Sequence, residues 1–185
     1  MSLFDFLSKR FSTAGEKFYV AKEDTIILDD ATILTELKID SNNFDVVIKN
    51  SLNETLSYSL SLKKGYELGD LNFSIRIESP TIIINAKTQK ANMSGCIEIS
   101  VPNNIEKYWI FSINGDINLH NAPISFLESE TVNGDINLHL IDAKYSFKAK
   151  TTNGDINNRI RNEAESENKI ICKTVNGDIN IDKIK

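Results

Sequence analysis

The sequence predicts an all-β protein: a single-chain, β-helix-like β-solenoid with coils of roughly 20 residues, preceded by a short N-terminal helix. The first observation is that the pentapeptide NGDIN occurs four times, at spacings of 19, 20 and 23 residues, beginning at Asn114, Asn133, Asn153 and Asn176. The second is that apolar and polar residues alternate around each copy, which is typical of a strand with one buried face. A repeat of this length indicates stacked coils rather than separate domains.

Residues 1–16 predict an amphipathic helix followed by a linker. Ser2 is a good helix cap, and the apolar residues that follow share one helical face: Leu3, Phe4, Leu7 and Phe11. We expect this helix to cap the solenoid, whose core would otherwise be open at its end. Docking to a membrane is the alternative. Residues 17–185 then form the β-solenoid-like domain.

The first half of that domain fits the coil pattern in part. Around Asn43, the expected apolar positions are filled by Leu37, Ile39, Val46 and Ile48, and Phe44 stands where later copies have Gly. Weaker copies surround Gly69 and Gly95, and the segments that lead into them, near Lys64 and Lys90, fit poorly. The sequence therefore predicts up to about seven coils. A small sheet that extends the solenoid is the alternative for this half.

The repeats are clearest in residues 108–185. Three columns of inward-facing residues precede the repeated Asn: Tyr108, Leu127, Phe147 and Ile170; Ile110, Ser129, Ala149 and Cys172; Ser112, Thr131, Thr151 and Thr174. After the Asn the apolar column shifts parity, to Ile117, Ile136, Ile156 and Ile179. A strand that changes its buried face must bend or bulge at that point.

Asn-Gly stands at each change of face and predicts a corner. The predicted structural corners are Asn114, Gly115, Asn133, Gly134, Asn153, Gly154, Asn176 and Gly177. Gly and Asn tolerate the left-handed backbone region, so we expect a positive φ at these glycines. A β-hairpin at each Asn-Gly is the alternative.

Two outward columns follow the corners. One contains Asn118, Asn137, Asn157 and Asn180, whose amides can hydrogen-bond from coil to coil. The other contains Asp116, Asp135, Asp155 and Asp178, the candidate residues of a cation-binding ladder. Hard cations need several convergent oxygens, so we interpret this column as turn chemistry and predict no bound metal.

The two histidines, His120 and His139, should be neighbours on an outer face. Two imidazoles can chelate a transition metal, but Arg159 and Asp182 occupy the same column in the next two copies. We interpret both histidines as surface residues of copied repeats.

Composition limits the function. The net charge of −5 and the scattered Lys and Arg residues argue against a nucleic-acid partner. The spacing of Cys96 and Cys172 predicts two thiols rather than a disulfide framework or a zinc site. No apolar run approaches the roughly 18 residues of a transmembrane segment, and Asp5 interrupts any signal peptide. We expect a cytoplasmic protein, with envelope association as the alternative.

Nothing in the sequence indicates catalysis. An active site breaks a repeat with a unique cluster, whereas these Asp residues recur in the same slot. We therefore predict a non-enzymatic protein without cofactors. Two alternatives remain: a carbohydrate-active enzyme, because paired carboxylates cleave glycosides, and a membrane-surface accessory protein tethered by the N-terminal helix.

Residues 33–185 resemble a known bacterial family. The residues that carry the resemblance are "GCIEISVPNNIEKYWIFSINGDINL" from Gly95, followed by "TVNGDINL" and "TVNGDINI". This progression resembles the domains of unknown function called putative adhesins. The resemblance implies an all-β, solenoid-like, adhesin-like interaction domain and no catalytic residues. We expect an unknown protein or glycan partner, and a monomer or a weak end-to-end dimer formed through the C-terminal strand edge.

Overall fold

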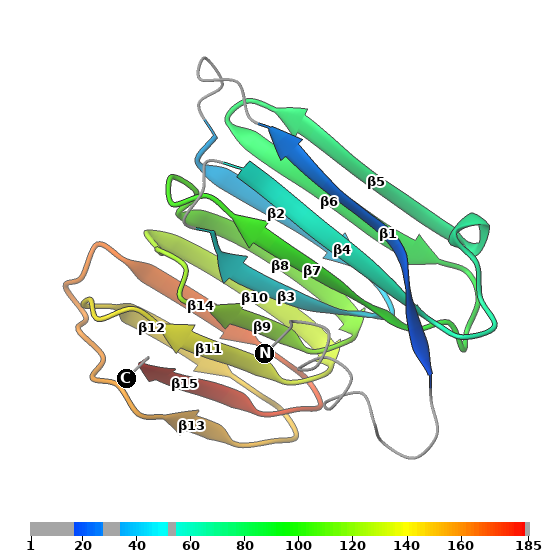
Figure 1. Ribbon diagram of the computed structural model, residues 1–185. Coiled ribbons are helices and arrows are strands. Elements are labelled where there is room, and N and C mark those ends of the chain that lie inside the picture. Colours follow the sequence, from blue (N-terminus) through cyan, green and yellow to red (C-terminus); the bar gives the residue numbers. More distant parts are fainter. Residues whose placement is uncertain (1–16, 28–33, 52–54, 184–185) are drawn as a thin grey trace.

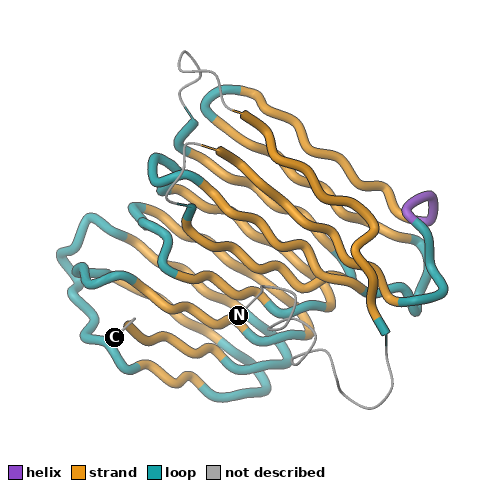
Figure 2. The backbone as a smooth tube through the Cα atoms, viewed as in Figure 1, coloured by secondary structure: helices purple, strands orange, loops and turns teal. Residues whose placement is uncertain are grey.

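The computed structural model describes residues 17–27, 34–51 and 55–183, and it shows two β-sheets packed face to face around one apolar core (Figure 1). The predicted all-β solenoid is confirmed. The predicted helix in residues 1–16 lies outside the described residues. In the described part of the chain, loops and turns lie at the ends of the strands (Figure 2).

The strands follow two orders of neighbours. The eight-stranded sheet contains, in order, β1 (Phe18–Ile27), β4 (Thr55–Lys63), β7 (Gly95–Val101), β3 (Phe44–Asn50), β9 (Ile117–His120), β11 (Ile136–Leu140), β15 (Ile179–Lys183) and β13 (Ile156–Asn158). The seven-stranded sheet contains, in order, β12 (Ser146–Lys150), β14 (Lys169–Lys173), β10 (Phe126–Asn133), β8 (Lys107–Asn114), β2 (Glu36–Ser41), β6 (Thr81–Thr88) and β5 (Leu71–Glu78).

Each coil is one strand of the seven-stranded sheet, a corner and one strand of the eight-stranded sheet. Coil strands pair in parallel with their counterparts, and Tyr108, Leu127 and Ile170 occupy matching positions, as their column predicted. The two strands that flank each Asn-Gly lie in different sheets, as β8 and β9 do, so the hairpin alternative is wrong. The coil predicted around Asn43 is confirmed as β2 and β3, with Phe44 buried at the corner.

The coils do not stack in sequence order. The last coil, β14 and β15, lies between β10/β11 and β12/β13, so β15 is an interior strand (Figure 1). The C-terminal strand therefore does not form the exposed edge that the sequence led us to expect; β12 and β13 form it instead. Every copy of the repeat presents the same hydrogen-bonding groups, so local sequence does not dictate which copies become neighbours.

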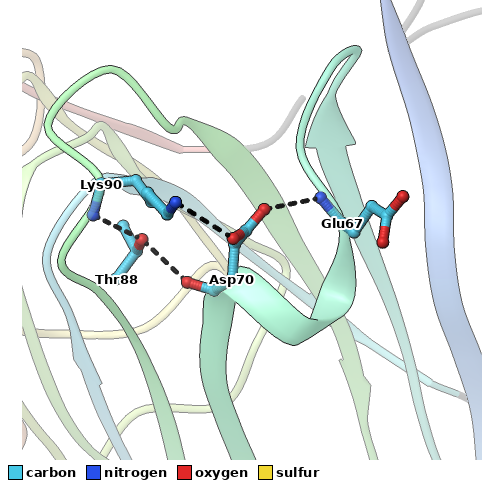
Figure 3. Close-up of polar contacts among 4 residues, drawn as sticks. All are labelled: Glu67, Asp70, Thr88 and Lys90. Carbon is cyan, nitrogen blue, oxygen red and sulfur yellow. Dashed lines mark hydrogen bonds and ion pairs between the residues drawn. The ribbon is translucent and has the colours of Figure 1, made fainter.

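The weak copy near Gly69 is not a coil. A 3₁₀ turn, Leu68–Asp70, leads into β5, which runs antiparallel to β6. Asp70 organises this turn: its Oδ2 accepts the Glu67 N–H at 3.2 Å, and its Oδ1 lies 3.5 Å from Lys90 Nζ (Figure 3). The Thr88 hydroxyl donates to the Asp70 carbonyl and accepts the Lys90 N–H (Figure 3). The poor fit near Lys64 and Lys90 thus marks the end of the parallel stack.

Antiparallel strands close this end of the solenoid. β4 pairs with β7, and β1 pairs with β4 at the sheet edge. Behind them, the rings of Tyr58 and Phe73 lie 5.6 Å apart, and Lys22 of β1 places its ammonium 6.0 Å and 5.7 Å from the two ring centroids. A charged side chain on an edge strand discourages pairing with another chain.

Repeat ladder and candidate binding face

The polar residues at and just before each corner hydrogen-bond to the neighbouring coil. The Thr131 hydroxyl donates to the Gly115 carbonyl at 3.0 Å, and Thr174 donates to Gly134 at the same distance. Thr151, in the outermost coil, donates to Gly177 at 2.9 Å. The hydroxyl side chains of this column therefore donate hydrogen bonds to the glycine carbonyls of the corners, which face away from the backbone hydrogen bonds of the sheet.

The corner glycines are required because adjacent coils touch there. A Cβ atom on Gly134 would lie 2.2 Å from the Gly115 carbonyl oxygen, and one on Gly177 would lie 2.1 Å from that of Gly134. The expected positive φ is wrong for Gly115, Gly134 and Gly154; of the four, only Gly177 has one, at 155°. Close approach of the backbones, rather than a left-handed conformation, selects glycine at these positions.

The Asn residues form amide ladders. Asn133 Nδ2 donates to Asn114 Oδ1 at 2.7 Å, and Asn176 Nδ2 donates to Asn133 Oδ1 at 2.6 Å. In the second column, Asn137 Nδ2 donates to Asn118 Oδ1 at 3.0 Å. Each ladder ties one coil to the next without any charge.

The Asp column also has a structural role. The backbone N–H of Asp135 donates to Asp116 Oδ1 at 2.9 Å, and the N–H of Asp178 donates to Asp135 Oδ1 at 2.8 Å. The N–H of Asp155 donates to Asp178 Oδ1, also at 2.8 Å. These bonds account for Asp at this position without a cation. Across the described residues, no three His, Cys, Asp or Glu side chains are grouped to hold a metal ion. That this column binds no cation stays a prediction.

The structure brings the two histidines together. The rings of His120 and His139 stack with centroids 4.7 Å apart and planes at 18°. Because β15 stacks directly on β11, Asp182 rather than Arg159 is the next residue in their row. His139 Nδ1 lies 2.5 Å from Asp182 Oδ1.

Both cysteines are buried thiols, as predicted. Burial raises the pKa of Cys172 to about 12, and the hydroxyl of Ser129, 3.4 Å away, opposes this shift. Burial likewise raises the pKa of Tyr108. A thiol with so high a pKa is almost never the reactive thiolate at neutral pH, so Cys172 is a packing residue.

The outer face of the seven-stranded sheet carries a cluster that the sequence analysis missed. Trp109, Phe111 and Phe126 lie on this face, on β8 and β10, and we call them the aromatic face. The rings of Trp109 and Phe126 are 5.3 Å apart, and Phe111 is 38% exposed. The sequence did contain a signal for this cluster. These aromatic residues occupy outward-facing positions of the strands, where the corresponding strands of other coils have mainly charged residues.

A shallow hollow of about 500 Å³ lies beside these rings. Its outward-facing lining combines aromatic, aliphatic and charged side chains: Trp109, Phe111, Ile83, Lys38, Asp40, Glu128 and Glu130. Lysines neutralise the carboxylates: Lys87 Nζ lies 2.5 Å from Asp40 Oδ2, and Lys173 Nζ lies 3.5 Å from Glu128 and 3.6 Å from Glu130. An apolar centre with a rim of paired charges is the usual anatomy of a protein-binding surface.

Lys38 and Asp40 place one charge of each sign in the hollow. Lys38 Nζ lies 5.1 Å from the Trp109 ring centroid, so the indole already holds a cation. Asp40 Oδ1 is buried and accepts no hydrogen bond from any residue that the structure describes. The described lining offers the carboxylates of Asp40, Glu128 and Glu130 and contains no Ser, Thr, Cys or His.

Comparison with known proteins places this architecture. Residues 87–185 match the family described as Toastrack DUF4097. The chain belongs to this family. The matched Toastrack region begins at the end of β6 and includes all four NGDIN corners and the aromatic face. No curated protein matches the chain.

Solved structures share the fold at low sequence identity. A putative cell adhesion protein from Clostridium sporogenes superposes with a TM-score of 0.55 at 13% identity, covering 88% of this chain and 99% of that protein. A putative adhesin from Parabacteroides merdae has a TM-score of 0.36 at 14% identity, covering 88% of this chain and 80% of that one. A putative adhesin from Bacteroides fragilis has a TM-score of 0.36 at 11% identity, covering 91% of this chain and 97% of that one. The first similarity shows the fold alone. In the described part of the chain, no helix has the length and apolar character needed to span a bilayer.

Proposed function

We propose that this Toastrack domain is a non-enzymatic, adhesin-like interaction domain that binds a protein or glycan partner through its aromatic face. The observation that carries the proposal is the cluster of Trp109, Phe111 and Phe126 on the solvent side of central strands. Aromatic side chains supply large contact area at little entropic cost, and they stack on sugar rings as readily as on protein groups. The paired charges at the rim supply polar groups that orient a ligand.

Binding can be followed directly because Trp109 is the only tryptophan in the chain. We would screen the intact protein against a glycan array and against isolated bacterial surface proteins, and then titrate each hit by tryptophan emission. Trp109→Phe has no tryptophan emission and therefore gives the background signal of the titration. We expect Phe111→Ala to weaken binding by about 30-fold or more, corresponding to a hot spot of about 2 kcal/mol.

Tyr19→Ala is the matched control. Tyr19 is also 38% exposed but lies on β1, in the other sheet. Tyr19→Ala should leave the ligand affinity unchanged. Both Tyr19→Ala and Phe111→Ala should retain the wild-type circular dichroism spectrum. Equal affinity of Phe111→Ala and wild type would show that the ligand binds elsewhere. A complete lack of binding would favour a purely structural scaffold.

A further inference from the structure

The outer face of the eight-stranded sheet carries a cluster of polar side chains. This cluster lies on the opposite side of the core from the aromatic face. His120, His139 and Asp182 lie in one row on the adjacent strands β9, β11 and β15. The two imidazoles stack at 4.7 Å, and the carboxylate lies 2.5 Å from Nδ1 of His139. This row exists only because the last coil is inserted next to β11.

The carboxylate has a specific chemical consequence for His139. In a neutral ring, an Nδ1–H that donates to Asp182 leaves the lone pair on Nε2, directed away from the carboxylate. A carboxylate that fixes a histidine in this way is the common outer partner of metal-binding histidines, and it holds the orientation of the ring. His120 supplies a second imidazole alongside.

We propose that His120 and His139 together bind one divalent transition-metal ion, with Asp182 as the positioning residue of His139. Imidazole nitrogens suit Zn²⁺, Ni²⁺ and Cu²⁺, with Cu²⁺ expected to bind most tightly. Two nitrogens bound to one metal at 2.0–2.1 Å must approach to about 3 Å of each other. The stacked rings must tilt toward each other to bring their nitrogens to that separation, and water completes the coordination.

The surrounding charges permit a cation here. On the far side of His120, Lys49 is the adjacent residue in the row, but its Nζ is 2.8 Å from Glu98 Oε1, which neutralises it. Beyond Asp182 the next position is Arg159, which is exposed. The carboxylate of Asp182, 2.5 Å from His139 Nδ1, places a negative charge beside the two rings, which favours a bound cation.

The test uses Zn²⁺ as the probe and the full chain. Cys96 and Cys172 are 2% and 0% exposed, so their thiols do not compete for zinc in the folded protein. Long-range ¹H–¹⁵N spectra of the imidazoles should show both histidines shifting with one equivalent of Zn²⁺. Calorimetry should give one site that weakens at least tenfold in His120→Gln and in His139→Gln.

Asp182→Asn tests the positioning role, and Asp142→Asn is its control. Asp142 pairs with Lys183 outside the histidine row. We expect Asp182→Asn to lower the Zn²⁺ affinity by about 10- to 100-fold and to change the ¹⁵N shifts that report the His139 tautomer, with Asp182→Glu restoring both. Asp142→Asn should change neither. Zinc that shifts only one ring, or that binds His120→Gln as tightly as wild type, would overturn the two-imidazole site; an unaltered affinity in Asp182→Asn would overturn the positioning role.

Discussion

At the scale of single residues, the corner glycines act through space and not through φ. Gly134→Ala would place a methyl group 2.2 Å from the Gly115 carbonyl oxygen, so the two coils must separate. Overpacking of this kind costs about 1–3 kcal/mol, and urea unfolding should show it. Gly69→Ala is the control, because nothing lies within 4 Å of its Cβ position, and it should change stability by less than about 0.5 kcal/mol. Equal stability of the two variants would contradict the close-contact explanation.

The Asp ladder makes a different prediction. Asp135 Oδ1 accepts the N–H of Asp178, and the amide oxygen of an asparagine can accept the same bond. Asp135→Asn should therefore change the unfolding free energy by less than about 1 kcal/mol, whereas Asp135→Ala should cost about 1–3 kcal/mol by leaving that N–H unsatisfied. Melting temperatures with millimolar calcium and with chelator decide the cation question. A calcium-dependent rise in the wild type that Asp135→Asn loses would show the column to be a cation site.

Cys172 predicts a loss of stability at alkaline pH. Burial raises its pKa from 9.0 to about 12, so above pH 9 the unfolded chain releases a proton that the folded protein keeps. The stabilisation is fully present below pH 9 and is lost as pH rises toward 12. Between pH 8 and 10.5 the wild type should lose roughly 1–2 kcal/mol more than Cys172→Ala in urea titrations. Parallel losses in the two proteins would show that this thiol ionises freely when folded.

At the scale of the elements, the coil order can be tested by disulfide trapping. Glu130 on β10 and Lys173 on β14 are partners in register, about 4.8 Å apart, whereas Lys150 on β12 is two strands away, roughly 10 Å. Disulfides need Cα atoms within about 7 Å. The pair Glu130→Cys with Lys173→Cys should therefore oxidise readily, and Glu130→Cys with Lys150→Cys should not. The reverse result would show coils stacked in sequence order.

The same distinction explains what the sequence could predict. Parity and spacing located the corners and the registers, because a buried column such as Tyr108, Leu127 and Ile170 must face one core. They could not order the coils, since each copy offers its neighbours the same Thr, Asn, Gly and Asp groups. Nor could alternation tell the antiparallel β4 from a coil strand, because both bury every second residue.

The candidate site was missed for a related reason. Sequence periodicity marks residues that are buried or repeated, and Trp109 and Phe111 are neither: they occupy outward positions in only one copy. The histidines were located correctly as neighbours, but their carboxylate partner depended on the inserted coil. A contact between Asp182 and His139 joins residues 43 positions apart, and it follows from the strand order alone.

At the scale of the whole molecule, the two ends of the stack differ. Antiparallel strands and Lys22 close one end, whereas β12 and β13 leave the other partly open. The side chain of Asn162 bonds both the N–H and the carbonyl of Phe147, at 3.1 Å and 3.3 Å, and so covers the edge of β12. On β13, Ile156 is 46% exposed, although Ile136 and Ile179 in the same column are fully buried.

This asymmetry predicts where the protein self-associates. An exposed edge strand with an apolar side chain favours pairing, and β13 has only three residues, so we expect a monomer in equilibrium with a weak dimer joined through β13. Ile156→Lys places a charge on that edge. It should raise the dimer dissociation constant, measured by sedimentation equilibrium, by tenfold or more. Ile77→Lys, at a similarly exposed isoleucine (39%) on β5 at the opposite end, should not. A dimer that survives Ile156→Lys but not Ile77→Lys would place the interface at the antiparallel end. A large oligomer that persists on dilution would contradict weak pairing altogether.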